Sequence, residues 1–149
     1  MNGRLEAIWL KRARRGPMDP VHTAVLELSR GLTGNTNFSA RRQITIISLE
    51  RWRELMAALG EDLDPAARRA NLMVSRINLE NSRDRVLRIG GLRLKINGET
   101  RPCERMDEAH AGLQRLMQDR WGGGAFAEVL DAGEITVGDP VAWELPLLD

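Results

Sequence analysis

Short extended segments separated by turns dominate this sequence and restrict the folds that it can adopt. Nine runs carry the period-two alternation or the β-branched residues that are typical of strands. These runs cover residues 3–11, 22–28, 42–48, 71–77, 85–89, 92–96, 125–130, 134–137 and 141–145. Many short strands at regular spacing predict a mainly β fold, built as a closed or nearly closed β-barrel.

The alternation also assigns side chains to faces of the expected strands. Leu5, Ala7 and Trp9 alternate along the first run and are expected to share one face. Gly90 and Gly91 separate two later runs and form a hairpin-turn signal, because both can adopt positive φ. The sequence therefore predicts an antiparallel hairpin at this point.

Helical spacing interrupts the strands in a few places. Residues 49–59 have apolar side chains at positions 49, 52, 55, 56 and 59, and Gly60 can end that helix. Residues 107–118 predict a second helix, and residues 65–69 a single turn. The barrel is thus expected to carry two or three inserted helices. No internal repeat, low-complexity tract or linker divides the chain, so residues 1–149 are predicted to form one domain.

Composition excludes several classes of protein. Apolar residues make up 42% of the chain and charged residues 29%, as in ordinary soluble globular proteins. A net charge of +1 argues against a dedicated nucleic-acid-binding protein. The first residues lack the apolar core of a signal peptide, and no stretch approaches membrane-spanning length. We therefore expect a cytoplasmic protein with neither nucleic acid nor membrane as a partner.

Cys103 is the only cysteine, so the chain can form neither an internal disulfide nor a tetra-cysteine metal site. Arg101 and Arg105 flank it, and fixed positive charge favours the thiolate form that attacks electrophiles and binds metals. Pro102 biases the chain before it toward an extended conformation. The alternative is an inert, buried cysteine, since Glu104 offsets part of the positive charge.

Arginine greatly outnumbers lysine among the 22 basic residues, because only Lys11 and Lys95 are lysines. Arginine binds carboxylate and phosphate through a planar fork, although a GC-rich genome also explains the excess. The number of arginines therefore does not by itself indicate a phosphate site, and only arginines at particular positions are evidence for one. Arg101 is expected to share a face with Cys103, because two residues separate side chains on one face of an extended segment.

Several segments, in the same order along the chain, resemble the MOSC domain, the module at the C-terminus of molybdenum cofactor sulfurases. The resemblance covers roughly residues 20–143. Its segments are Gly31-Leu32-Thr33-Gly34-Asn35, residues 42–47, residues 71–74, Leu87-Arg88-Ile89-Gly90, Glu99-Thr100-Arg101-Pro102-Cys103, residues 123–127 and residues 133–139.

This resemblance implies a β-barrel with helical excursions and a role around the molybdenum cofactor, a pterin dithiolene that ends in a phosphate. In the family, the cysteine that aligns with Cys103 is proposed to carry sulfur as a persulfide or to coordinate molybdenum. Both roles need an exposed thiolate, and molybdenum is thiophilic. Cys103 is thus the expected catalytic residue and molybdenum ligand.

Bound cofactor would need donors for its phosphate and pterin. Arg41 and Arg42 precede a predicted strand and could point into the mouth of the barrel, or could simply be a solvated strand end. Together with Arg101 they are candidate cofactor-binding residues. Asn71 could bond a pterin edge, or serve a turn or bulge.

Two further residues are candidates for binding the cofactor. Gly123 lies in a triple glycine that could form an amide-lined anion nest, or a flexible turn. Glu99 could orient a ligand or an arginine, or form a structural salt bridge. No pyridoxal phosphate is expected, because neither lysine lies in a sequence that resembles a pyridoxal site.

The sequence departs from the family pattern after its Gly-Leu pair. MOSC domains commonly have Gly-Asp followed by an arginine and a histidine, whereas this chain has Gly34-Asn35-Thr36-Asn37. The carboxylate, the guanidinium and the imidazole are all missing from this stretch. This difference from the family pattern predicts altered or lost turnover and leaves the expected fold unchanged.

Three functions are compatible with these features. The first is a sulfur carrier that loads Cys103 from a partner cysteine desulfurase. The second is a molybdenum-cofactor reductase of N-hydroxylated compounds, with Cys103 as metal ligand and an electron-donor protein as partner. The third is a non-catalytic barrel that binds a small anion or a protein. The sequence gives no oligomeric state and does not distinguish the first two functions.

Overall fold

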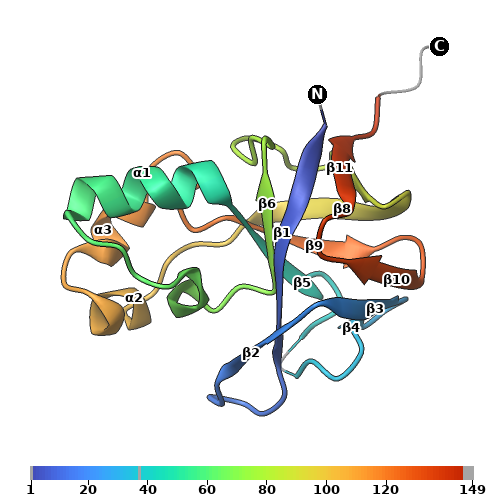
Figure 1. The fold of residues 1–149 in the computed structure, drawn as a ribbon, viewed down its shortest axis with the longest axis horizontal. Coiled ribbons are helices and arrows are strands. Elements are labelled where there is room, and N and C mark those ends of the chain that lie inside the picture. The colour runs from blue at the N-terminus through green and yellow to red at the C-terminus, as the bar shows by residue number, and fades with distance from the viewer. Residues whose placement is uncertain (1, 37, 146–149) are drawn as a thin grey trace.

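The computed structural model describes residues 2–36 and 38–145, which form one β-barrel with helices on one side (Figure 1). The strands follow the predicted runs closely. They are β1 (Gly3–Lys11), β2 (Met18–Val21), β3 (Thr23–Glu27), β4 (Gly31–Leu32), β5 (Ile44–Ser48), β6 (Leu72–Ser75), β7 (Val86–Ile89), β8 (Leu92–Glu99), β9 (Ala125–Val129), β10 (Gly133–Thr136) and β11 (Pro140–Trp143).

Seven strands close into a barrel, which confirms the predicted fold class. Their order is β11-β7-β8-β9-β5-β6-β1, and pairing of β11 with β1 completes the ring. All neighbours are antiparallel except β5 and β6, which run parallel. β2 extends the sheet from β1, and β10, β3 and β4 form a second, three-stranded sheet. The chain leaves and returns to the barrel between β5 and β6 and again between β8 and β9, where the helices are inserted.

The face assignment in β1 is wrong beyond its first residues. Leu5 lies in the barrel interior, but so do Ile8 and Leu10, whereas Trp9 packs in a separate cluster outside the barrel. The pairing of β1 with β6 shifts register between Leu5 and Ala7. A β-bulge adds one residue to the strand and therefore exchanges the two faces after it.

The hairpin at Gly90 and Gly91 is present as predicted. β7 and β8 pair antiparallel across it, and the two glycines have φ values of 56° and 87°. Positive φ at both central residues is the geometry that matches the twist of the adjoining strands. The short strands β2 and β4 carry no clear alternation and were not predicted.

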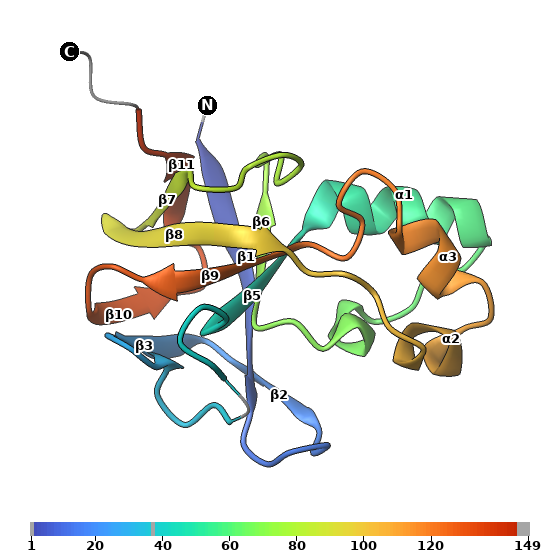
Figure 2. The same cartoon turned by 180° about the vertical axis from the view of Figure 1, so that it is seen from behind.

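All helices lie on one side of the barrel, as the two opposite views in Figure 1 and Figure 2 show. They are α1 (Leu49–Leu59), the 3₁₀ helix η1 (Pro65–Arg68), α2 (Arg105–Ala109) and α3 (Leu113–Met117). Between them and the outer face of the barrel lies a second apolar cluster rich in methionine and tryptophan. Its buried members are Trp9, Ile47, Trp52, Leu55, Met56, Ala70, Met73, Met106, Leu113 and Met117.

Helix α1 has the bounds that the sequence predicts. The Ser48 hydroxyl accepts a hydrogen bond from the Arg51 amide, and Gly60 ends the helix at a φ of 70°. The second predicted helix is instead two short ones. The chain becomes extended at His110 and Gly112 adopts a φ of 89°, so the helical hydrogen bonds stop before α3 begins. No helix of the described residues is long and apolar enough to cross a lipid bilayer.

Candidate functional site

Cys103 lies in the loop that joins β8 to α2, and its side chain is exposed. Backbone hydrogen bonds hold both ends of this loop. The Thr100 amide donates to the Gly124 carbonyl at 2.9 Å, and the Cys103 carbonyl accepts from the Met106 amide at 3.0 Å. The loop therefore presents the thiol to solvent, so the alternative of a buried cysteine is wrong.

Arg68, at the end of η1, is a buried guanidinium beside this loop, with 7% of the residue exposed. Its Nε donates to the Gly123 carbonyl at 3.0 Å, and one terminal nitrogen lies 3.5 Å from the Thr100 carbonyl. The other terminal nitrogen lies 3.9 Å from the Met106 sulfur. Arg68 thus joins the segments that precede and follow Cys103 to the glycine turn before β9.

The charge on Arg68 is not matched by a carboxylate in any of these contacts. Burial, and to a smaller extent the charge of Arg42, lower the pKa of Arg68 to about 10, while Cys103 acts in the opposite direction. The guanidinium is therefore still protonated at neutral pH. A buried cation without an anion is costly, so this position favours a negative group nearby.

Gly123 is fixed in this arrangement by close contacts. A Cβ on Gly123 would lie 2.1 Å from the Thr100 carbonyl oxygen and 3.2 Å from a terminal nitrogen of Arg68. The amides of the two adjacent glycines donate to carbonyls within the turn, Gly122 to Asp119 and Gly124 to Trp121. Those two amides are thus occupied, and the contacts of Gly123 are structural.

A cationic pocket of about 370 Å³ lies between the end of β1, the loop before β5 and the end of η1. Its wall contains three cationic side chains and no carboxylate among the described residues. The lining residues are Lys11, Met18, Asn35, Phe38, Ser39, Arg42, Gln43, Thr45, Arg69 and Asn71. Of the arginines predicted as ligands, Arg42 is the one that lines this pocket.

Positive charge accumulates around the pocket. Burial lowers the pKa of Lys11, and four arginines lower it further: Arg69, Arg105, Arg42 and Arg14. Burial and Arg105 likewise lower the pKa of Arg69. We call the following five residues the basic rim: Lys11, Arg14, Arg42, Arg69 and Arg105. Because its members repel one another, the rim is suited to binding an anion.

Cys103 lies beside this pocket rather than in its wall. Arg105 follows it by two residues and acts on Lys11 and Arg69 at the rim. Arg68 experiences the charges of both Arg42 and Cys103. The exposed thiol, the buried guanidinium and the basic rim therefore belong to one region of the molecule.

Asn71 contributes to the pocket wall, but its side chain is engaged by the protein. Its Oδ1 accepts from the Thr45 amide at 3.1 Å, and its Nδ2 donates to the Trp9 carbonyl and to Asn35 Oδ1. Asn35 Oδ1 also accepts from the Lys11 amide at 2.8 Å. The asparagine at the family's aspartate position therefore connects the end of β1 to Asn71, the residue just before β6. Asn37 lies outside the described residues.

The remaining predicted ligands lie away from the pocket wall. A terminal nitrogen of Arg41 is 3.5 Å from the Asn97 carbonyl on β8. Arg101 is exposed in the cysteine loop, and Glu99 is half-buried at the end of β8, opposite Ala125. None of the three lines the cationic pocket.

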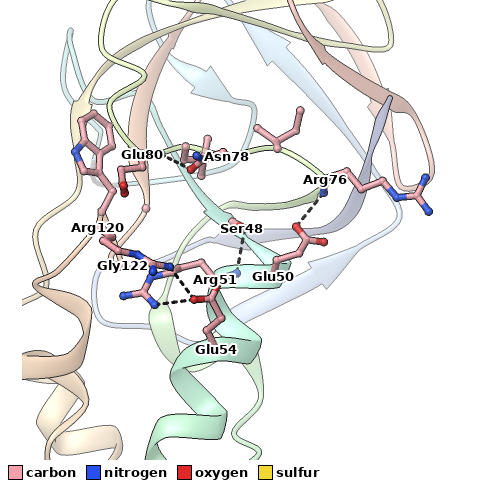
Figure 3. Close-up of a pocket in the computed structure, with 13 residues that line it drawn as sticks. Ser48, Glu50, Arg51, Glu54, Arg76, Asn78, Glu80, Arg120 and Gly122 are labelled. Atoms are coloured by element: carbon pink, nitrogen blue, oxygen red, sulfur yellow. Dashed lines mark hydrogen bonds and ion pairs between the residues drawn. The ribbon is translucent and has the colours of Figure 1, made fainter. Parts of the chain in front are cut away.

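A second cavity, of about 490 Å³, lies at the N-terminal end of α1 (Figure 3). Its central charges compensate one another: Glu54 pairs with both Arg51 and Arg120, at 3.3 Å and 2.8 Å. Glu50 accepts from the Arg76 amide at 2.9 Å. This cavity thus lacks the excess of positive charge that distinguishes the cationic pocket. Among the residues described, no group of three or more His, Cys, Asp or Glu side chains could hold a metal ion.

The sequence did not identify Lys11, Arg68, Arg69 or Arg105 as site residues. Arg68 ends a single helical turn, Arg69 follows it, and Lys11 ends a strand. Their common location depends on how β1, η1 and the cysteine loop pack. A basic residue at a strand end or after a turn gives no local signal of such an arrangement.

The barrel, the inserted helices and the exposed cysteine loop agree with the class of protein that the sequence pattern indicates. The chain belongs to the MOSC domain family, whose sequence pattern it matches over residues 33–142. No curated protein matches the chain significantly in sequence.

Solved structures have the same fold at low sequence identity. The YuaD protein from Bacillus subtilis is 18% identical with a TM-score of 0.81, covering 95% of this chain and 94% of that one. YiiM from Geobacillus stearothermophilus is 14% identical with a TM-score of 0.77, covering 96% and 75%. YiiM from Escherichia coli is 16% identical with a TM-score of 0.71, covering 98% and 72%. These likenesses concern the fold.

Proposed function

We propose that this protein is a sulfur carrier in molybdenum cofactor chemistry and that Cys103 holds the sulfur as a persulfide. The observation that carries the proposal is an exposed thiol on a fixed loop beside a basic rim and a buried guanidinium. An exposed thiol is accessible to the persulfide sulfur of another protein. Positive charge nearby stabilises the anionic sulfur species on either side of the transfer.

The loading step conserves atoms and electrons. The Cys103 thiolate attacks the outer sulfur of a persulfide carried by a partner cysteine desulfurase. A sulfur–sulfur bond forms at Cys103, the partner's sulfur–sulfur bond breaks, and its electron pair leaves as the partner's thiolate. Arg68 and Arg105 lie where they can stabilise negative charge on this loop. Delivery to an acceptor thiolate repeats this exchange: the acceptor attacks the outer sulfur of the Cys103 persulfide, and Cys103 leaves as the thiolate.

The residues present also fit the molybdenum cofactor, with which MOSC domains are associated. The cofactor's phosphate is an anion, and Lys11, Arg42 and Arg69 in the pocket wall would hold it. A cavity of about 370 Å³ lies within the size range of small-molecule sites. Cys103 would be the soft ligand for molybdenum. When bound, the cofactor would supply a metal centre that takes up sulfur or exchanges electrons.

Intact mass measures the carrier function directly. After incubation with a cysteine desulfurase and cysteine, the wild-type protein is expected to gain the mass of one sulfur atom, and reduction should remove it. Cys103→Ser should gain nothing. A serine variant that gains sulfur as readily as the wild type would exclude Cys103 as the carrier.

The neighbouring arginines offer a matched pair for the phosphate. Arg42 lines the pocket, whereas Arg41 contacts the Asn97 carbonyl on β8. We expect Arg42→Gln to weaken retention of the pterin phosphate by about ten-fold, because it removes one charge-assisted contact. Arg41→Gln should leave retention unchanged. Equal losses in the two variants would contradict the assigned phosphate site.

The second candidate is the reductase, which the cationic pocket beside the thiol also supports. Its electrons would come from a partner protein. Molybdenum and pterin content, measured after expression in a host that makes the cofactor, separates the two functions. Stoichiometric metal that disappears in Cys103→Ser favours the reductase. Protein that gains sulfur without retaining metal favours the carrier, and protein that does neither leaves the non-catalytic binding barrel.

A further inference from the structure

The loop between β1 and β2, residues 12–17, carries three arginines beside the cationic pocket; it lies at the bottom of Figure 1. Arg12 pairs with Asp19 at 2.9 Å, while Arg14 and Arg15 are exposed. A terminal nitrogen of Arg69 donates to the Gly16 carbonyl at 2.7 Å, which ties the loop to the pocket wall. We call residues 12–17 the arginine loop.

The arginine loop and the basic rim form one continuous basic surface. Arg14 is close enough to lower the pKa of Lys11, together with Arg69, Arg105 and Arg42. Two acidic residues belong to these segments. Asp19 is already paired with Arg12, and Glu104 is the residue after Cys103 in the chain. The cations of the arginine loop and the basic rim outnumber the net charge of the whole chain, +1, so the rest of the chain is net negative.

We propose that this basic surface docks an acidic segment of a partner protein and that the docked segment covers Cys103. The inference rests on the proposed function only in identifying that partner as the protein that exchanges sulfur or electrons with Cys103. Charge complementarity of this kind steers encounter and fixes orientation, which a transfer between two proteins requires. The tie between Arg69 and Gly16 keeps the loop in position before the partner arrives.

An acidic protein fits this surface better than a nucleic acid does. Nucleic-acid-binding domains are usually strongly basic overall, with cations along an extended stripe that follows the phosphate backbone. Here the cations surround one pocket and lie near one thiol, on a chain whose net charge is only +1. A short run of carboxylates can cover such a patch, because arginine forks bind carboxylates in a bidentate manner.

Binding of a fluorescently labelled oligoglutamate peptide tests the proposal, measured by anisotropy in about 0.15 M salt. We expect Arg14→Glu combined with Arg15→Glu to weaken binding by about ten-fold or more, since attraction becomes repulsion at two positions. Both side chains are exposed, so the fold should be retained. Absence of peptide binding to the wild-type protein would overturn the proposal.

Arg53→Glu combined with Arg115→Glu is the matched control, because it changes the net charge equally at exposed positions on α1 and α3. Neither arginine is among the charges that act on Lys11. Equal weakening in both double variants would mean that the peptide follows net charge, not this surface. Tighter binding of a single-stranded oligonucleotide of equal charge would instead assign the surface to nucleic acid. Both results would overturn the proposal.

The reaction of Cys103 with iodoacetamide, an uncharged reagent, tests whether the docked segment covers the thiol. Saturating peptide should slow this alkylation several-fold in the wild-type protein and not in the arginine-loop variant. An unchanged rate would show that docking does not reach Cys103. These readouts contain no sulfur transfer. Failure of persulfide loading would therefore contradict the proposed function while leaving the docking result intact.

Discussion

At the scale of single residues, Arg68 connects the most parts of the site. It is buried, it contacts two carbonyls and a thioether, and it experiences the charges of Arg42 and Cys103. Burying an uncompensated guanidinium lowers stability, so the chain retains a cation here at a cost. An anionic sulfur on Cys103, or an anion in the pocket, would offset that cost. The folded protein is thus expected to be more stable when a negative group lies near Arg68.

Gly123 gives the sharpest stability prediction at this scale. Gly123→Ala should destabilise the protein by about 2 kcal/mol or more, because a backbone oxygen cannot move away as a flexible side chain can. The added methyl group would lie 2.1 Å from the Thr100 carbonyl. Denaturant unfolding followed by tryptophan fluorescence measures the loss.

Gly60→Ala is the matched control for that substitution. Gly60 has a φ of 70° and nothing within 4 Å of the added Cβ, so the change should cost about 1 kcal/mol of backbone strain. If Gly123→Ala lowers the free energy of unfolding no more than Gly60→Ala does, the turn before β9 relaxes around the added methyl group. The turn would then not hold Arg68 in place.

At the scale of elements, helices and strands follow the sequence to different degrees. Helix α1 has local signals at both ends, and its bounds are those predicted. The segment that contains α2 and α3 lacks such signals and breaks at Gly112, where φ is positive. Strand β1 has the predicted bounds, but its bulge exchanges the faces of its side chains. Helix caps are local, whereas a bulge depends on the partner strand.

One ion pair links β8 to the turn after β9 and predicts a pH dependence of stability. Two nitrogens of the Arg93 side chain donate to the two carboxylate oxygens of Asp131, at 2.8 Å and 3.0 Å. The hydrogen bond to Arg93 is the main cause that lowers the pKa of Asp131 from 3.8 in the folded protein. Because the folded pKa lies below the unfolded value, this stabilisation is complete above that value. It is lost as pH falls through the folded pKa.

We therefore expect Asp131→Asn to lower Tm at neutral pH, and the difference from wild type to shrink as pH falls below 3.8. The effect should be modest, since the pair is partly exposed. Thermal unfolding by circular dichroism at several pH values provides the measurement. Asp62→Asn, at an exposed position, is the control. A difference that stays constant down to the lowest pH would contradict the ion pair as its source.

At the scale of the whole molecule, closure of the barrel depends on its last strand. β11 pairs with both β1 and β7, so the two ends of the chain complete the ring. This closure gives β7, the hairpin partner of β8, a strand on its other side. The hairpin from which the cysteine loop departs is thereby held within a closed ring of strands.

Val141 tests this closure, because its side chain is fully buried in the barrel core. Val141→Asp should lower the free energy of unfolding by on the order of 4 kcal/mol or more, since a carboxyl group would be buried without a partner. A small domain has little stability beyond that, so cooperative unfolding should be lost. Heteronuclear NMR spectra and thermal melts report the outcome.

Ala142→Asp is the neighbouring control, because adjacent strand residues point to opposite faces. Ala142 is partly exposed and lies opposite Arg88 in β7, so a carboxylate is accommodated there. This variant should melt close to the wild type. A folded, cooperative Val141→Asp protein would mean that β11 is not needed to close the barrel.

The sequence by itself determined the strand runs, helix α1, the hairpin at Gly90 and Gly91, and the family. The strands, the helix and the hairpin follow from local periodicity, caps and turn residues, which act over a few positions. The family follows from the resemblance of several segments in the same order along the chain. It also singled out Cys103, because a lone cysteine between arginines is a local pattern.

Only the tertiary structure decided which cations from distant parts of the chain join Arg105 in the region of that cysteine. Lys11 and Arg69 come from a strand end and a turn that are far apart in the chain. Arg42 joins them, whereas its neighbour Arg41 contacts β8. The physical reason is that strand pairing and barrel closure set these distances. Charge and burial depend on distance in space, not on separation along the sequence.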